Sequence, residues 1–110
     1  MNSPHVPQFF LDIAYFLKDT NPKLAAKIAS NAIELDSDNS SVLKASAYLF
    51  QELGQTDNAI LTYKKLIELK PKDAQSYRDL ALEYQYAKDF EKAIEAVSYT
   101  HLTLPTTPYV

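Results

Sequence analysis

The sequence contains a single glycine and has neither cysteine nor tryptophan. Without cysteine the chain cannot form a disulfide framework, a thiolate zinc site or a cysteine nucleophile. One glycine does not suffice for the glycine-rich loop that holds phosphates in many nucleotide-binding proteins. No cluster of convergent polar residues stands out in the remaining sequence. We therefore expect no cofactor and no catalytic activity.

Neither sign of charge dominates the chain. The 11 lysine and arginine residues and the 14 aspartate and glutamate residues are interspersed and give a formal net charge of -3. This balance gives no electrostatic reason to expect nucleic acid or an anionic membrane as a partner. Apolar runs are also short, and none approaches the roughly 18 residues that a membrane-spanning helix needs. We expect no membrane insertion, and the sequence predicts no particular cellular compartment.

The 110 residues, 46% of them apolar, are enough for one small domain. Similar residues recur along the chain at a spacing of 34 residues, and such a fixed period is typical of repeat proteins. The recurring positions are aromatic or small, namely Phe16, Phe50 and Tyr84, and Ala25, Ala59 and Ala93. Between them, apolar residues follow one another at steps of three and four, the spacing of one face of a helix. The sequence therefore predicts repeating units of two amphipathic helices each.

Residues that start and stop helices separate the predicted elements. Asn21 and Pro22 form an N-cap followed by proline at the first helical position. Gly54 suits the left-handed residue that follows a helix, and Pro71 stops the next one. Further candidate N-caps are Thr56 or Asp57, Asp73 and Asp89. The predicted helices cover residues 7–18, 22–35, 41–53, 57–69, 74–87 and 90–98.

These units resemble the tetratricopeptide repeat, a helix–turn–helix with the pattern W-x2-L-G-x2-Y, A-x3-F and a closing proline. In the middle unit Leu43 takes the tryptophan position, Phe50 the tyrosine position, and Ala59 and Tyr63 form the A-x3-F pair. The resemblance covers roughly residues 6–97. It implies an all-α, right-handed α-solenoid of about three repeats, at residues 6–39, 40–73 and 74–97, the last one truncated.

The first repeat departs from the family pattern. Asp12 and Ile13 occupy its leucine and glycine positions, and Ser37 replaces the closing proline.

In the third repeat, the segment from Gln75 to Leu82 resembles the repeat segment of large bacterial proteins that also carry inter-alpha-trypsin-like and von Willebrand type A domains. This second resemblance implies that the chain is a fragment of a larger bacterial protein.

In this family the first helix of each repeat lines a concave groove. The residues that the resemblance places there as a partner-binding surface are Phe10, Lys44, Tyr48, Gln51, Arg78, Leu82, Gln85 and Tyr86. We expect this surface to hold an extended peptide or a partner helix, with apolar anchors giving affinity and the two cations selecting acidic neighbours. The alternative is that the groove packs against a flanking domain of the same protein. Either alternative makes the chain a protein-interaction or interdomain scaffold.

Self-association is a second functional hypothesis. No polar capping helix follows the last repeat, so apolar surface around Ala93, Ile94 and Val97 is expected to stay open. Such a surface can pair with a second copy of the chain in a homodimer.

Other candidate sites have simpler explanations. His5 and His101 lie near the termini with no set of neighbouring ligands. The run that begins at Asp36 starts like a calcium loop, but Ser41 replaces the required glycine and Ala47 the bidentate glutamate. A turn that ends in a helix N-cap explains this run. We predict no metal site.

The end of the chain differs in composition from the rest. No lysine, arginine, aspartate or glutamate follows Glu95. Residues 97–106 resemble translated sequencing-adapter read-through, so we expect residues 98–110 to be an irregular tail that is not native sequence. The alternative is a genuine polar C-terminal extension, since chain ends are where irregular sequence is tolerated.

Overall fold

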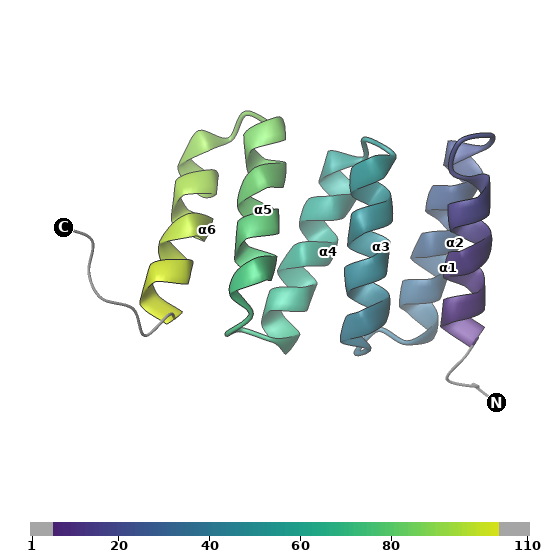
Figure 1. The fold of residues 1–110 in the computed structure, drawn as a ribbon, viewed down its shortest axis with the longest axis horizontal. Helices are drawn as coiled ribbons and strands as arrows, with labels where there is room; N and C mark the ends of the chain where they lie inside the picture. Colours follow the sequence, from purple (N-terminus) through teal and green to yellow (C-terminus); the bar gives the residue numbers. More distant parts are fainter. Residues whose placement is uncertain (1–5, 104–110) are drawn as a thin grey trace.

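Six α-helices are arranged as consecutive antiparallel pairs that form a row, in which the first helix lies in front of the second (Figure 1). The computed structural model describes the backbone of residues 6–103 and the side chains of residues 6–98. The helices are α1 (Val6–Leu17), α2 (Pro22–Leu35), α3 (Ser40–Glu52), α4 (Thr56–Leu69), α5 (Ala74–Tyr86) and α6 (Phe90–Thr103). No strand occurs within residues 6–103. The predicted all-α solenoid of helix–turn–helix repeats is confirmed.

The first five helices begin and end within one residue of the predicted bounds, but the sixth is longer than predicted. Helix α6 continues to Thr103 instead of ending at residue 98. No glycine or proline interrupts the chain before Pro105, so nothing local stops the helix. The irregular tail predicted for residues 98–110 is therefore wrong for residues 98–103. Residues 104–110 lie outside the described residues, and the non-native origin of the tail stays a prediction.

Side-chain caps fix where most helices begin. The carboxamide oxygen of Asn21 accepts a hydrogen bond from the Leu24 backbone N–H at 3.2 Å, and Asn39, Asp73 and Asp89 cap the starts of α3, α5 and α6 in the same way. Helix α4 is different. Its N-cap is Gln55, which makes no side-chain capping bond. The predicted cap at Thr56 or Asp57 was wrong, because both residues lie inside the first turn of α4.

The turns after α3 and α5 share one backbone geometry. Gly54 has a positive φ of 72° and Lys88, 34 positions later, has a φ of 63°. After each of them, a backbone N–H reaches back to the last turn of the helix, from Gln55 to the Phe50 carbonyl and from Asp89 to the Tyr84 carbonyl, both at 2.9 Å. The left-handed turn predicted at Gly54 is confirmed. In the third repeat Lys88 takes the same left-handed conformation.

Small residues let the helices pack closely. Fully buried alanines lie at the helix crossings, namely Ala25, Ala29, Ala47 and Ala59. Larger side chains, among them Leu43, Phe50 and Tyr63, fill the space beside them and are also buried. The first helices of the repeats, α1, α3 and α5, together line the hollow that is the candidate site. None of the described helices is long and apolar enough to cross a membrane.

Candidate functional site

The face formed by α1, α3 and α5 contains a hollow of about 630 Å³. Its lining residues are Tyr15, Tyr48, Gln51, Glu52, Gly54, Thr56, Asp79, Glu83 and Tyr86. We call this surface the tyrosine groove, because each of the three first helices contributes one exposed tyrosine to it. Tyr15 is 41% exposed, Tyr48 38% and Tyr86 61%. Aromatic side chains of this kind supply large, rigid contact area for a protein partner.

Contacts within and between repeats hold the middle tyrosine in place. The rings of Tyr48 and Tyr63 meet edge to face, with centroids 6.4 Å apart. The Tyr63 hydroxyl donates to the Gln51 side-chain oxygen at 2.7 Å, and the Tyr48 hydroxyl donates to Asp79 Oδ2 at 3.4 Å. Burial and the Asp79 carboxylate raise the pKa of Tyr48 above its ordinary value. The neutral form of the phenol, which donates to Asp79, is thereby favoured.

The groove is acidic at two places. At the first, Glu52 forms an ion pair with Lys18 at 3.8 Å, and the Lys18 ammonium lies 6.0 Å from the centre of the Tyr15 ring. Burial and the neighbouring Glu52 carboxylate raise the pKa of Tyr15. The negative charge of Glu52 is thus partly balanced within the fold.

At the second place, Asp79 and Glu83 lie one turn apart on α5. Asp79 accepts hydrogen bonds from Tyr48 and from the Gln75 amide, the latter at 2.9 Å. Glu83 is only 1% exposed, and its Oε2 atom has no hydrogen-bond partner. Burial, together with the nearby Asp79 charge, raises the pKa of Glu83. Among residues 6–98 no lysine or arginine forms an ion pair with either carboxylate.

The eight residues predicted for the groove fall into separate places. Tyr48, Gln51 and Tyr86 line the tyrosine groove. Arg78, Leu82 and Gln85 line a different hollow at the end of the row. Phe10 is partly buried and packs against the hydrophobic core.

The two predicted cations are engaged inside the chain. The Lys44 ammonium lies 3.5 Å from Asp73 Oδ2, next to the N-cap of α5. Although burial alone raises it, the pKa of Asp73 is lowered on balance by hydrogen bonding from Ser76 and by the Lys44 charge. Arg78 donates to the Gln75 side-chain oxygen at 3.2 Å. Neither Lys44 nor Arg78 lines the tyrosine groove. The charged side chains that line it are the carboxylates of Glu52, Asp79 and Glu83, so the groove is negative where the sequence predicted positive charge.

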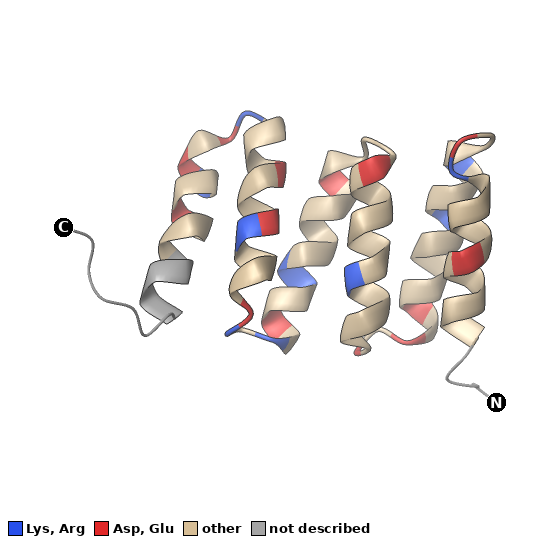
Figure 2. Cartoon of the chain, in the orientation of Figure 1, with Lys and Arg blue, Asp and Glu red and all other residues tan. Residues whose placement is uncertain are grey.

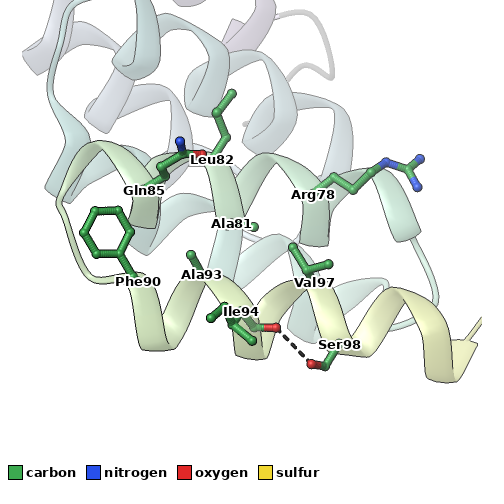
Figure 3. A pocket seen from close by; sticks show the side chains of 9 residues that line it. All are labelled: Arg78, Ala81, Leu82, Gln85, Phe90, Ala93, Ile94, Val97 and Ser98. Carbon is green, nitrogen blue, oxygen red and sulfur yellow. Dashed lines mark hydrogen bonds between the residues drawn. The ribbon is translucent and has the colours of Figure 1, made fainter.

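The hollow at the end of the row lies between α5 and α6 and has a volume of about 650 Å³ (Figure 3). Its lining residues are Arg78, Ala81, Leu82, Gln85, Phe90, Ala93, Ile94, Val97 and Ser98. Most of them are apolar, and Ile94 and Phe90 are 68% and 58% exposed. We call this surface the C-terminal edge. It contains the open apolar surface predicted around Ala93, Ile94 and Val97.

The prediction from sequence missed the carboxylates of the groove. Asp79 follows Arg78 directly, but only Arg78 was assigned to the groove. Glu83 stands 34 positions after Leu49, a fully buried core residue. A glutamate at the position of this buried leucine was the available signal.

The described residues include no group of three or more side chains that could bind a metal ion. Acidic and basic residues are mixed on the same helices (Figure 2).

Comparisons with known proteins agree with this architecture. Residues 42–73 match the model of the tetratricopeptide repeat family, so the middle unit is a tetratricopeptide repeat. The resemblance predicted from the sequence is confirmed at this unit. Among curated proteins no match was found.

Solved structures with a similar fold include those of MamA. A mutant of MamA superposes with a TM-score of 0.75 and 18% identity, covering 96% of this chain and 78% of that one. A crystal structure of MamA gives a TM-score of 0.70 and 18% identity, covering 88% of this chain and 57% of the other. At this identity the likeness shows a shared fold alone.

Proposed function

We propose that this protein is a non-catalytic scaffold that binds a partner protein through the tyrosine groove. The observation that carries the proposal is the convergence of Tyr15, Tyr48 and Tyr86, from three successive repeats, on one hollow. Exposed tyrosines on a rigid helical frame lose little conformational entropy when a partner covers them. The tetratricopeptide repeat at residues 42–73 supports a role in protein interaction.

We also propose that the chain is part of a larger bacterial protein. The resemblance of the segment from Gln75 to Leu82 to multidomain proteins with inter-alpha-trypsin-like and von Willebrand type A domains supports this context. In that setting the groove holds either a segment of a separate protein or a flanking domain of the same protein. Binding in trans, tested with free peptides, distinguishes the two.

The test uses a random peptide library displayed on phage and selected on the immobilised protein. We expect selected peptides to bind the wild type and to lose about tenfold or more in affinity for Tyr86→Ala, because truncating an aromatic anchor removes a central contact. Tyr86 is 61% exposed, so its truncation leaves the core intact. The matched control is Leu61→Ala on α4, which is 64% exposed and does not line the groove.

Two outcomes would contradict the binding of a separate peptide in the groove. Peptides that bind Tyr86→Ala as well as the wild type would place the site elsewhere. A selection that yields no peptide dependent on the groove would remove the support for binding in trans, and leave a flanking domain as the occupant.

Self-association is a second candidate, favoured by exposed apolar side chains on α1 and α6. Ile94 is 68% exposed, whereas Ile60 and Ala26, at the same position of the earlier repeats, pack in the core. Phe16 is 85% exposed, whereas Phe50, its equivalent, is 2% exposed. The apolar positions that neighbouring repeats cover inside the row are thus uncovered at its ends. A second copy that stacks its α1 on the C-terminal edge would cover both.

Sedimentation velocity over a range of protein concentrations tests this candidate. We expect Ile94→Asp and Phe16→Asp, one at each end of the row, each to return an associated species to monomer. Leu61→Asp adds the same charge at an exposed site away from both ends and should leave association unchanged. A wild type that stays monomeric at every concentration would rule self-association out.

A further inference from the structure

The carboxylates on α5 give the tyrosine groove an unbalanced negative charge. Lys18, which also pairs with Asp19, partly balances Glu52, whereas no described lysine or arginine pairs with Asp79 or Glu83. The two cations predicted for the groove do not supply it, because Lys44 pairs with Asp73, and Arg78 donates to Gln75 and lines the hollow between α5 and α6. The groove therefore has two carboxylates for which the fold itself supplies no positive partner.

Glu83 is the more unusual of the two. Its side chain is 1% exposed, lines the groove, and leaves Oε2 without a hydrogen bond. A buried carboxylate without a partner destabilises a protein. Packing does not require it, because Leu49 fills the equivalent position of the middle repeat and is fully buried. An acid that costs stability and that packing does not need points to a ligand that supplies the missing positive charge.

The rings around these carboxylates suit the same ligand. Tyr48 donates its hydroxyl to Asp79 Oδ2, so its ring lies next to this carboxylate, and Tyr86 follows Glu83 by three residues on α5. Lysine and arginine side chains combine a long apolar stem with a cationic head. The stem packs against tyrosine rings, while the head gains both from carboxylates and from the electron-rich ring faces.

We propose that the tyrosine groove recognises a basic side chain, arginine or lysine, in an extended segment of a partner protein, with the cation seated between Asp79 and Glu83. This inference rests on the proposed function of the groove as a peptide-binding surface. It reverses the specificity expected from the sequence, in which Lys44 and Arg78 select acidic partners. The charge of the groove, and not its shape alone, chooses the partner.

The experiment continues from the phage selection. We expect the peptides that depend on Tyr86 to be enriched in arginine and lysine. In a selected peptide, each arginine is replaced in turn by citrulline, which keeps the shape of the side chain and removes its charge. We expect one such replacement to weaken binding about tenfold or more, because a buried charged partner is then left unpaired.

Variants of the protein supply the second half of the test. Glu83→Gln and Asp79→Asn keep the size of each side chain and remove its charge, and each should abolish the preference for arginine over citrulline. Glu34→Gln, an exposed site on α2, makes the same change in net charge away from the groove and should keep the preference. Circular dichroism checks that all three variants are folded.

The outcomes separate this inference from the proposed function. Peptides that require Tyr86 but show no basic enrichment, or that bind equally well with citrulline, would overturn the cation site and leave the groove as the binding surface. An equal loss of preference in Glu34→Gln would show that net charge alone draws the peptide, which also overturns the site. If no selected peptide depends on Tyr86, the binding of a separate peptide in the groove and the cation site are both overturned.

Discussion

Lys88 is a residue whose backbone conformation costs stability. Its φ of 63° lies in the left-handed region, where side chains with a Cβ are disfavoured, and its equivalent in the preceding repeat is Gly54. We predict that Lys88→Gly raises the free energy of unfolding by about 0.5–1 kcal/mol, measured by urea denaturation.

The reverse change is the matched control for the Lys88 prediction. Gly54→Ala should lower stability by about 1 kcal/mol, although a Cβ at this position would meet no atom within 4 Å. A Lys88→Gly variant less stable than the wild type would mean that the lysine side chain contributes more than its backbone conformation costs.

Glu83 makes stability depend on pH in a defined direction. Its pKa is raised in the folded protein above the ordinary value of 4.5, so the folded state holds its proton more tightly than the unfolded state. This contribution to stability is complete below pH 4.5 and is lost as the pH rises through the folded-state pKa. We predict that Glu83→Gln becomes more stable relative to the wild type between acid and neutral pH.

Urea midpoints of the two proteins, measured at a series of pH values, check the Glu83 prediction. Glu34→Gln, at an exposed site, should follow the wild type across the series. A constant difference between Glu83→Gln and the wild type at all pH values would show that the carboxyl is ionised equally easily in both states.

At the scale of the helices, close packing depends on the alanines at the crossings. Ala59 on α4 is fully buried. We predict that Ala59→Leu destabilises the protein by about 1–3 kcal/mol, because the larger side chain pushes the packed helices apart. Thermal unfolding followed by circular dichroism measures the effect. Ala87→Leu, at an exposed position after α5, should change the melting temperature little, and an equal effect of the two variants would contradict the packing of Ala59.

The helices were predictable from the sequence because their signals are local and repeated. Caps such as Asn21 and Asp73 and the left-handed turn at Gly54 act within a few residues, and the spacing of 34 repeats the apolar pattern of the helices along the chain. The end of α6 was not predictable in this way. Its last residues carry neither a helix-stopping residue nor an apolar face, so the pattern was absent although the helix continues to Thr103.

The chemistry of the groove was less predictable than its position. The family resemblance placed Tyr48 and Tyr86 on the first helices of their repeats, and both line the hollow of the tyrosine groove. It did not reveal that Lys44 reaches Asp73 or that Arg78 turns toward Gln75, since both contacts depend on side-chain direction. Glu83 was missed because its equivalent in the middle repeat is the buried Leu49, and a carboxylate is not expected where a leucine packs in the core.

At the scale of the whole molecule, stability should fall from the middle of the row toward its ends. Tyr63 and Leu66 of α4 are fully buried, whereas Phe16 on α1 and Ile94 on α6 are exposed. Repeat arrays unfold by steps when the repeats at the ends have fewer covered faces. We predict that amide hydrogens of α3 and α4 exchange most slowly and those of α1 and α6 fastest, measured by hydrogen–deuterium exchange with mass spectrometry. Uniform exchange across all six helices would indicate a single cooperative unit.

The packing of each helix against near neighbours in the chain also bears on how the protein is made. The closely packed helix pairs are adjacent in sequence or, for α1 and α3, one helix apart. The first two repeats therefore have most of their packing partners before α5 and α6 leave the ribosome, and contacts of this short range form quickly. The chain can thus begin to fold from its N-terminal end during translation.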